Sequence, residues 1–177
     1  LAWKLSKSNM VTNVFVAPGN GGTEIEELIQ NIDIEANDIE KLSAFVKREG
    51  VDLTIVGPED PLVEGITDKF QEEGLLCFGP SKDAARLEGS KEFMKDFLIR
   101  HNIPTASYET FTDSKKAISY IKEQGCPIVI KADGLAAGKG VTVAFNVDQA
   151  IEAVNQSLES KTFGEAGSKI VVEEYIK

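Results

Sequence analysis

Residues 128–145 read IVIKADGLAAGKGVTVAF, and this stretch decides the fold of the second half of the chain. Residues 128–130 and 141–145 are rich in β-branched and aromatic side chains, so they predict two strands. The glycines between them allow the backbone to adopt positive φ angles and to approach a ligand closely. The stretch therefore predicts a strand, a thin glycine-rich loop and a second strand.

The loop has the composition of a phosphate-binding loop. Its backbone N–H groups can surround phosphate oxygens, and Lys131 and Lys139 can add positive charge. It is not a Walker A loop, because three residues separate Gly134 from Gly138, and Gly140 stands where Ser or Thr is required. It also lacks the third glycine of a dinucleotide fingerprint. An ordinary hairpin, in which the glycines serve only turn geometry, is the alternative.

The composition is that of a globular protein of one or two domains. The chain has 177 residues and a net charge of −10, which argues against a nucleic-acid or membrane partner. No apolar run approaches the length of a membrane span. Cys77 and Cys126 are expected to be reduced in a cytoplasmic protein. Two Cys and one His cannot form a zinc site by themselves.

Residues 1–89 alternate strands with helices. Strands are expected at 11–17, 51–56 and 75–78, and helices are expected to begin at Asp38 and Asp60. Repeated β-loop-α units predict a parallel sheet with helices on its faces. Loops 18–22 and 57–61 would then follow strands at their carboxyl ends, where such sheets bind ligands. Plain βα turns are the alternative for both loops.

A different pattern follows residue 90. Ser90 is expected to begin a helix that ends at Arg100, with Lys91 and Lys95 one turn apart. Surface lysines exposed to solvent are the alternative interpretation of this pair. Strands at 108–111, 127–132, 141–145 and 170–175, with helices at 113–123 and 147–158, predict an α+β arrangement.

Five motifs occur in order along the chain. They are VAPGN at 16–20, GPEDPL at 57–62, LEGSK at 87–91, KADGLAAGKG at 131–140 and VEE at 172–174. Together they resemble the glycinamide ribonucleotide synthetase family of ATP-grasp ligases, and the resemblance extends over nearly the whole chain. Asp60 departs from the family pattern, in which a small residue is expected between Glu59 and Pro61.

The resemblance implies the α/β fold class: a doubly wound parallel-sheet N-terminal domain followed by the first α+β lobe of an ATP-grasp fold. The implied domains are an N-terminal α/β domain at 1–89, a connecting helix and linker at 90–106, and an incomplete nucleotide-binding lobe at 107–177. Both ends look truncated. The family's opening strand and glycine-rich turn would precede Leu1, and its metal ligands and glycine-binding groups would follow Lys177.

The implied activity is an ATP-dependent ligation in cytoplasmic purine biosynthesis. Glycine is joined to 5-phosphoribosylamine through a glycyl phosphate, with Mg²⁺ or Mn²⁺ as the metal, and ADP and phosphate are released. We expect the 177-residue segment alone to be inactive. The alternatives are another ATP-grasp carboxylate–amine ligase, a non-catalytic nucleotide-binding module and, from the β-α-β start alone, an NAD-dependent oxidoreductase.

The resemblance also implies roles for individual residues, although no catalytic residue is assigned. The implied ATP-binding residues are Lys91, Lys131, Gly134, Gly138, Lys139, Gly140, Glu173, Glu174, Tyr175 and Ile176. The implied substrate-binding residues are Gly19, Asn20, Gly57, Glu59, Pro61 and Asp133.

Overall fold

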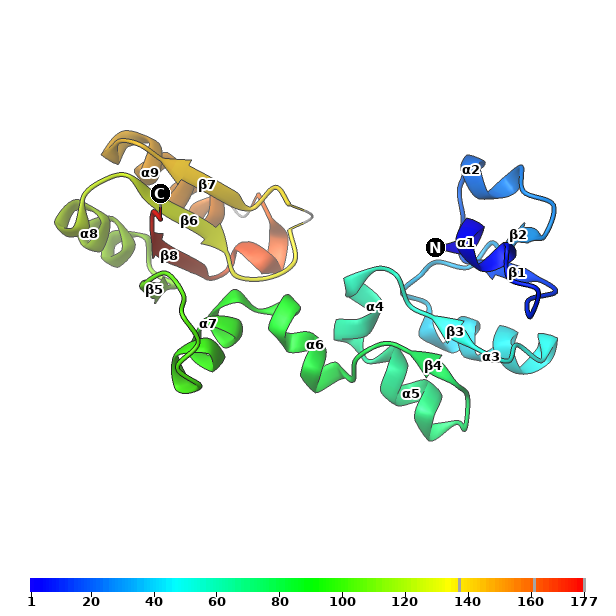
Figure 1. The fold of residues 1–177 in the computed structure, drawn as a ribbon. Coiled ribbons are helices and arrows are strands. Elements are labelled where there is room, and N and C mark those ends of the chain that lie inside the picture. Colours follow the sequence, from blue (N-terminus) through cyan, green and yellow to red (C-terminus); the bar gives the residue numbers. More distant parts are fainter. Residues whose placement is uncertain (137, 161, 177) are drawn as a thin grey trace. The chain divides into compact units, whose positions relative to one another are not determined.

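The computed structural model describes residues 1–136, 138–160 and 162–176. Its contacts divide the chain into two compact units, Leu1–Ala85 and Arg86–Lys177. Helix α6 (Lys82–Gly89) contains the point of division. Figure 1 labels the elements of both units, and each unit is described here by itself.

The N-terminal unit contains short parallel strands and helices. Its elements are α1 (Ala2–Ser6), β1 (Val14–Val16), α2 (Gly21–Glu24), β2 (Ile29–Asn31), α3 (Ile39–Glu49), β3 (Thr54–Ile55), α4 (Glu59–Glu64), α5 (Ile66–Glu72) and β4 (Cys77–Phe78). Strand β1 pairs with β2, and β3 pairs with β4, both in parallel. The predicted parallel pairing is confirmed, but among the described residues the strands form two separate pairs.

Local sequence explains where the helices of this unit begin and end. The Asp38 carboxylate accepts a hydrogen bond from the backbone N–H of Lys41 and caps α3, as predicted. The expectation that Asp60 begins the next helix is wrong, because α4 begins at Glu59 after Pro58. Gly65, with φ of 102°, then ends α4 and separates it from α5.

The C-terminal unit contains one antiparallel sheet. Its elements after α6 are α7 (Lys91–Arg100), β5 (Tyr108–Phe111), α8 (Ser114–Gln124), β6 (Ile128–Ala132), β7 (Val141–Ala144), α9 (Val147–Val154), a π-helical turn (Asn155–Glu159), a 3₁₀ turn (Gly164–Gly167) and β8 (Ile170–Glu174). The strand order is β5-β8-β6-β7, and every neighbouring pair is antiparallel. The predicted α+β arrangement is confirmed, including the strands on both sides of the glycine-rich loop.

One face of this sheet forms the core with α8 and α9. Ile128 and Ile130 of β6 pack there with Ile121 of α8 and Val154 of α9, and all four side chains are buried. Alternate residues of a strand point to opposite faces. Val129 and Lys131 therefore lie on the other face, together with their cross-strand neighbours on β7 and β8.

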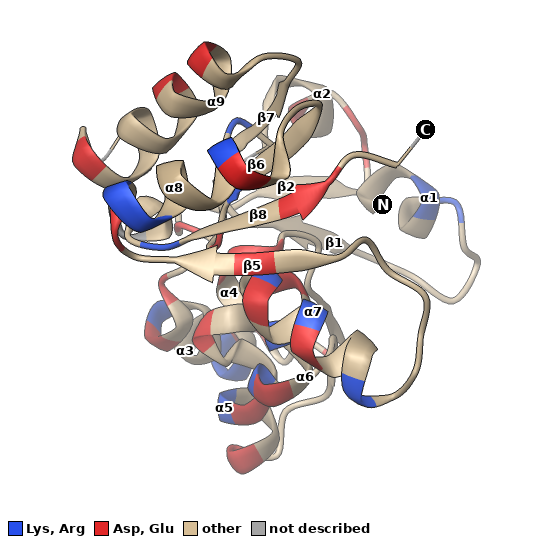
Figure 2. Ribbon diagram, turned by 90° about the vertical axis from the view of Figure 1, so that its left-hand side faces the viewer, with Lys and Arg blue, Asp and Glu red and all other residues tan. Residues whose placement is uncertain are grey.

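Helix α7 covers only part of that other face. Thr110 of β5 donates a hydrogen bond to the Glu92 carboxylate of α7 at 3.0 Å, and Tyr108 of β5 donates one to Asp96. Figure 2 shows the charged residues of α7 next to β5. In the part of the face formed by β6 and β7, Val141 and Val143 are 45% and 40% exposed and the Lys131 side chain is 25% exposed, so solvent reaches it. We call this part the open face.

In the part of the chain that the structure describes, no helix is both long enough and apolar enough to cross a membrane.

Candidate functional site

A buried ionic cluster lies where α7 meets the sheet. The ammonium group of Lys131 lies 2.9 Å from Oε2 of Glu173, and that of Lys95 lies 3.2 Å from the same oxygen. The Glu173 side chain is 6% exposed and that of Lys95 is 3% exposed, whereas Lys131 is 25% exposed. Lys131 is thus the member of the cluster that a ligand on the open face can reach.

Lys91, at the start of α7, lies beside the beginning of the glycine-rich loop. Its Nζ donates hydrogen bonds to the carbonyl oxygens of Gly134 at 3.0 Å and Asp133 at 3.4 Å. Burial lowers the pKa of Lys91; the charge of Asp133 partly offsets this effect, and the charge of Lys131 adds to it. Lys91 and Lys131 thus both carry positive charge near the start of the glycine-rich loop, where each can attract an anion.

The Asp133 carboxylate holds the N-terminus of α7. It accepts a hydrogen bond from the backbone N–H of Glu92 at 2.7 Å and from the Ser90 hydroxyl at 3.2 Å. The backbone carbonyl of Asp133 also accepts from the N–H of Lys91 at 3.1 Å. These contacts tie the loop to the helix and give Asp133 a structural role. Its proposed contact with substrate stays a prediction.

Close packing explains two of the loop glycines. A Cβ atom on Gly140 would lie 2.8 Å from the Cβ of Ala136 and 2.9 Å from that of Ala132. A Cβ atom on Gly134 would lie 2.9 Å from the backbone of Ala166. Side chains at these two positions would force the neighbouring backbone to shift, so the loop keeps its shape only with glycine.

The tip of the loop is more open. Gly138 has a φ of 74°, and apart from the glycine and its chain neighbours no atom of a described residue lies within 4 Å of the position that a Cβ would occupy. Lys139 is exposed, and its backbone N–H donates to the carbonyl of Ala136 at 2.9 Å. The backbone of Gly138 needs the conformation that glycine adopts readily, while Lys139 presents its charge to solvent.

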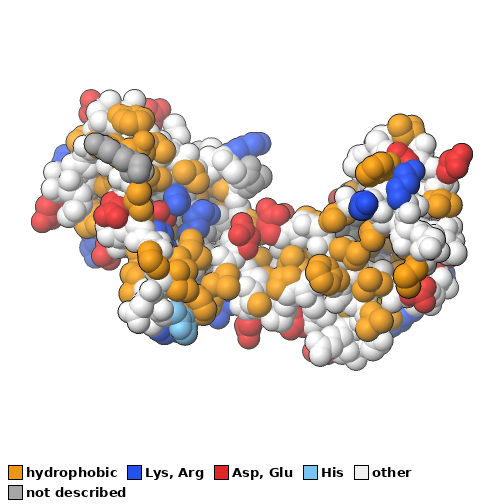
Figure 3. All heavy atoms as spheres, viewed as in Figure 1, with side chains coloured by type: hydrophobic (Ala, Val, Ile, Leu, Met, Phe, Trp, Pro, Cys, Tyr) orange, Lys and Arg blue, Asp and Glu red, His pale blue; other side chains and the backbone are white. Residues whose placement is uncertain are grey.

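Apolar side chains flank the lysines on the open face. Val141 and Val143 of β7 are 45% and 40% exposed. Phe145 contacts Tyr175 edge to face, with ring centroids 5.9 Å apart. Figure 3 shows hydrophobic and basic side chains side by side on this unit. A ligand with a flat apolar part and an anionic part fits such a surface.

Residues 173–176 comprise the last two residues of β8 and the two residues that follow it. The Glu174 carboxylate accepts a hydrogen bond from the Ser107 hydroxyl at 2.6 Å. This hydrogen bond is the main cause of the lowered pKa of Glu174. The side chains of Tyr175 and Ile176 are exposed. Oε1 of Glu173 is buried and has no hydrogen-bond partner among the described residues. A buried carboxylate oxygen of this kind can accept a hydrogen bond from a ligand amino group.

Sequence reasoning missed Lys95. Both lysines at the start of α7 could have been exposed, yet Lys95 is buried and Lys91 is half-buried. A weak signal was present, because Lys95 directly follows Met94 and lies three residues before Leu98, and both of these residues are apolar. Its partner Glu173 lies far along the chain on β8, and only the fold reveals that contact.

The substrate-binding residues expected in the N-terminal unit follow β1 and β3. Gly19 has a φ of 83°, and the Asn20 side chain caps α2 by accepting from the N–H of Gly22 at 2.9 Å and of Thr23. Gly57 and Glu59 are exposed, whereas Pro61 is buried in α4. Among the described residues, no hydrogen bond or ion pair joins these two loops. Their roles stay predictions.

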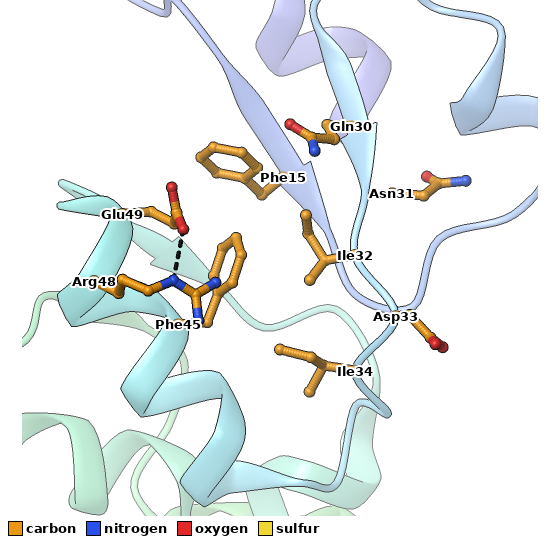
Figure 4. Close-up of a pocket in the computed structure, with 9 residues that line it drawn as sticks. All are labelled: Phe15, Gln30, Asn31, Ile32, Asp33, Ile34, Phe45, Arg48 and Glu49. Atoms are coloured by element: carbon orange, nitrogen blue, oxygen red, sulfur yellow. Dashed lines mark hydrogen bonds and ion pairs between the residues drawn. The ribbon is translucent and has the colours of Figure 1, made fainter.

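A separate pocket of 420 Å³ lies between α3 and strands β1 and β2. Phe15, Ile32 and Phe45 project toward it in Figure 4, with Arg48 at its edge. The Arg48 guanidinium is already paired with Glu49 at 2.8 Å. None of the predicted substrate-binding residues lines this pocket, so it is distinct from the loops at 18–22 and 57–61.

The described residues contain no group of three or more His, Cys, Asp or Glu side chains that could hold a metal ion. The side chains of the open face therefore fit an anionic ligand with an aromatic ring, but they do not form a protein metal centre.

Family comparisons agree with the geometry of both units. Residues 1–88 match the phosphoribosylglycinamide synthetase N domain, and residues 89–177 match the ATP-grasp (A) domain of the same synthetase. The phosphoribosylamine–glycine ligase of Pasteurella multocida is 57% identical over 176 residues, and that of Haemophilus influenzae is 54% identical. The matches cover 99% of this chain but 41% of each relative.

Solved structures give the same fold. The crystal structure of the phosphoribosylamine–glycine ligase from Thermotoga maritima superposes with a TM-score of 0.70 at 28% identity, over 93% of this chain and 38% of that one. A biotin carboxylase from Campylobacter jejuni superposes with a TM-score of 0.66 at 23% identity, over 80% of this chain and 32% of that one, and this likeness concerns the fold alone. The α/β fold class inferred from the motifs is confirmed, and the chain belongs to the phosphoribosylglycinamide synthetase family.

Proposed function

We propose that this chain forms the nucleotide-binding part of an ATP-dependent ligase that joins glycine to 5-phosphoribosylamine in cytoplasmic purine biosynthesis. The observation that carries the proposal is the placement of Lys91 and Lys131 beside the glycine-rich loop, on the open face of the antiparallel sheet. Membership in the synthetase family makes ATP the anionic ligand to expect there.

The triphosphate lies against Lys91, Lys131 and the loop at 134–140. Lys131 has one partner among the described residues, Glu173, so two of the three N–H donors of its ammonium group remain for phosphate oxygens. The backbone N–H groups of the loop add further donors, and Lys139 at the exposed tip supplies a third positive charge. These groups orient the phosphates and stabilise their negative charge.

The adenine ring packs on the apolar part of the same face. Val143 and Phe145 supply its contact surface, and residues 173–176 supply backbone groups for its polar edge. The buried Oε1 of Glu173 offers an acceptor for the exocyclic amino group. This assignment accounts for a buried carboxylate oxygen that has no hydrogen-bond partner in the described part of the chain.

Bound ATP would supply a phosphoryl group to the glycine carboxylate, with ADP as the leaving group, and the amine of 5-phosphoribosylamine would then displace inorganic phosphate from the activated carbonyl. The chain contributes the electrostatic positioning of that phosphoryl group through Lys91 and Lys131. Mg²⁺ or Mn²⁺ accompanies the nucleotide in this proposal. No step is assigned to the metal, because the described residues do not gather ligands for one.

The residues of the N-terminal unit that we assign to 5-phosphoribosylamine, without individual roles, are Gly19, Asn20, Gly57, Glu59 and Pro61. Gly57 and Glu59 follow a parallel strand at its carboxyl end, where sheets of this class bind ligands. Asp133, in the C-terminal unit, is proposed to bind substrate, and its partner group is not assigned.

Nucleotide binding by the full-length protein tests the proposal. Isothermal titration with ATP and Mg²⁺ is expected to give saturable binding that Lys131→Met weakens at least about tenfold, since a phosphate contact is lost. Lys122→Met is the matched control, because Lys122 is an exposed lysine of α8 on the opposite side of the sheet. Equal affinities in all three proteins would contradict the assignment of Lys131.

A further inference from the structure

Lys95 is a buried lysine whose ammonium group contacts only protein groups among the described residues. It donates to the Thr105 hydroxyl at 2.8 Å and to the Ala106 carbonyl at 3.0 Å, and it forms an ion pair with Oε2 of Glu173 at 3.2 Å. Because its side chain is only 3% exposed, a ligand on the open face does not reach it. Lys95 is therefore not itself a phosphate-binding lysine, although it lies one helical turn from Lys91.

The position of Lys95 nevertheless affects the charge that a ligand meets. Glu173 Oε2 is shared by the buried Lys95 and by the partly exposed Lys131. The three side chains together carry two positive charges and one negative charge. Without Lys95, the charge of Glu173 would neutralise that of Lys131 in a weakly solvated environment, where charges interact strongly.

We infer that Lys95 is a positioning residue for phosphate binding: it neutralises and fixes the Glu173 carboxylate, so that the ammonium charge of Lys131 remains available to the triphosphate. This inference rests on the proposed function. Lys95 does not itself contact the nucleotide phosphates, but it preserves the positive charge with which Lys131 attracts them.

The test measures how nucleotide affinity depends on the number of phosphates. The full-length protein and its Lys95→Met variant are titrated with AMP, ADP and ATP by calorimetry. Met fills similar space without a charge. Removal of the compensating charge is expected to raise the Kd for ATP by about tenfold, and the Kd for AMP by a clearly smaller factor, because the electrostatic loss grows with ligand charge. An equal loss for all three nucleotides would show a structural role only and would overturn the inference.

Two control variants separate charge from packing. Lys95→Arg keeps the charge and is expected to keep ATP affinity within about threefold of the parent protein. Thr105→Ala removes one hydrogen bond of Lys95 and keeps the charge, so the Kd values for AMP, ADP and ATP are expected to keep the ratios that they have in the parent protein. A change of these ratios in Thr105→Ala like that expected for Lys95→Met would contradict the inference.

A double variant keeps the test decisive if Lys95→Met folds poorly. Lys95→Met with Glu173→Gln removes both buried charges together, which avoids an unpaired ion. Lys131 then has no carboxylate to neutralise it. Glu173→Gln also alters the adenine contact, but it does so equally for AMP and ATP, so the ratio of ATP affinity to AMP affinity is expected to rise at least about fivefold above that of Lys95→Met. A double variant whose ratio stays as low as that of Lys95→Met would overturn the inference.

The outcome for the parent protein separates this inference from the function on which it rests. If the parent binds no ATP, the proposed function fails and the inference fails with it. If the parent binds ATP and Lys95→Met binds it equally well, the inference alone is wrong.

Discussion

The ammonium group of Lys95 lies 3.2 Å from Oε2 of Glu173, and both side chains are almost completely buried. The pair joins α7 to β8 inside the C-terminal unit. Removal of one partner from a buried ion pair leaves the other charge without compensation. The stability of this unit therefore depends on both residues.

Glu173→Ala is expected to lower the free energy of unfolding by about 3–5 kcal/mol, because Lys95 would stay buried without a counter-ion. Glu173→Gln keeps a hydrogen-bond acceptor and is expected to lose less. Urea unfolding followed by circular dichroism measures both, with Glu174→Gln, a change at an exposed residue of the same strand, as the control. Equal stability of Glu173→Ala and the parent chain would show that the ion pair is not formed.

Asp133→Ala is expected to destabilise α7. The Asp133 carboxylate accepts from the N–H of Glu92 at 2.7 Å at the first turn of that helix, and loss of such a cap costs about 1 kcal/mol. Asp133→Asn keeps an acceptor and should cost less. Thermal unfolding measures the difference. An unchanged stability in Asp133→Ala, together with lost substrate affinity, would instead favour a purely ligand-binding role.

Substitutions in the glycine-rich loop are expected to differ by position. Gly140→Ala places a Cβ 2.8 Å from that of Ala136, so the loop must shift and ATP affinity must fall. Gly138→Ala meets no atom of a described residue within 4 Å apart from its chain neighbours and suffers only from its φ of 74°, a cost of about 1 kcal/mol. Nucleotide titration of both variants is the measurement. A larger loss of affinity in Gly138→Ala than in Gly140→Ala would contradict the packing described for Gly140.

The N-terminal unit is expected to lose stability in acid through Glu73. Hydrogen bonds from Ser43, and then from Lys47 and Lys69, lower the pKa of Glu73 to about 2. A carboxyl with a depressed pKa in the folded state stabilises the fold above its unfolded pKa of 4.5, and this contribution is lost as the pH falls toward 2. Stability should therefore decrease between these values.

Glu73→Gln should flatten that decrease, while Glu72→Gln, at the exposed neighbouring position, should leave it unchanged. Urea unfolding at a series of pH values measures the effect at low salt, since exposed ion pairs are screened by salt. Identical pH profiles for Glu73→Gln and the parent chain would contradict the role of Glu73.

Local signals in the sequence predicted much of the C-terminal unit. Ser90 and Asp113 cap α7 and α8 as expected, and the β-branched runs around the glycine-rich loop form β6 and β7. These features depend on neighbouring residues, which a sequence displays directly. The signals were weaker in the N-terminal unit, where β2 contains a single apolar residue, Ile29, and was missed.

Contacts between distant residues were beyond the reach of the sequence. Lys95 could have been an ordinary surface lysine because its burial depends on Glu173, which the sheet brings to it. The capping role of Asp133 likewise depends on α7 packing against the loop. Single residues of the substrate site have no pattern of their own, so their roles cannot be read from spacing.

The most direct test of the proposed ligase is the release of phosphate from ATP by the full-length protein. With Mg²⁺ present, release is expected to require both glycine and 5-phosphoribosylamine, and to fall at least about a hundredfold in Lys131→Ala, since we propose that Lys131 positions the phosphates in the transition state. The proposal would be contradicted by phosphate release that needs neither substrate, by release that responds to a different acid or amine, or by release that persists in Lys131→Ala.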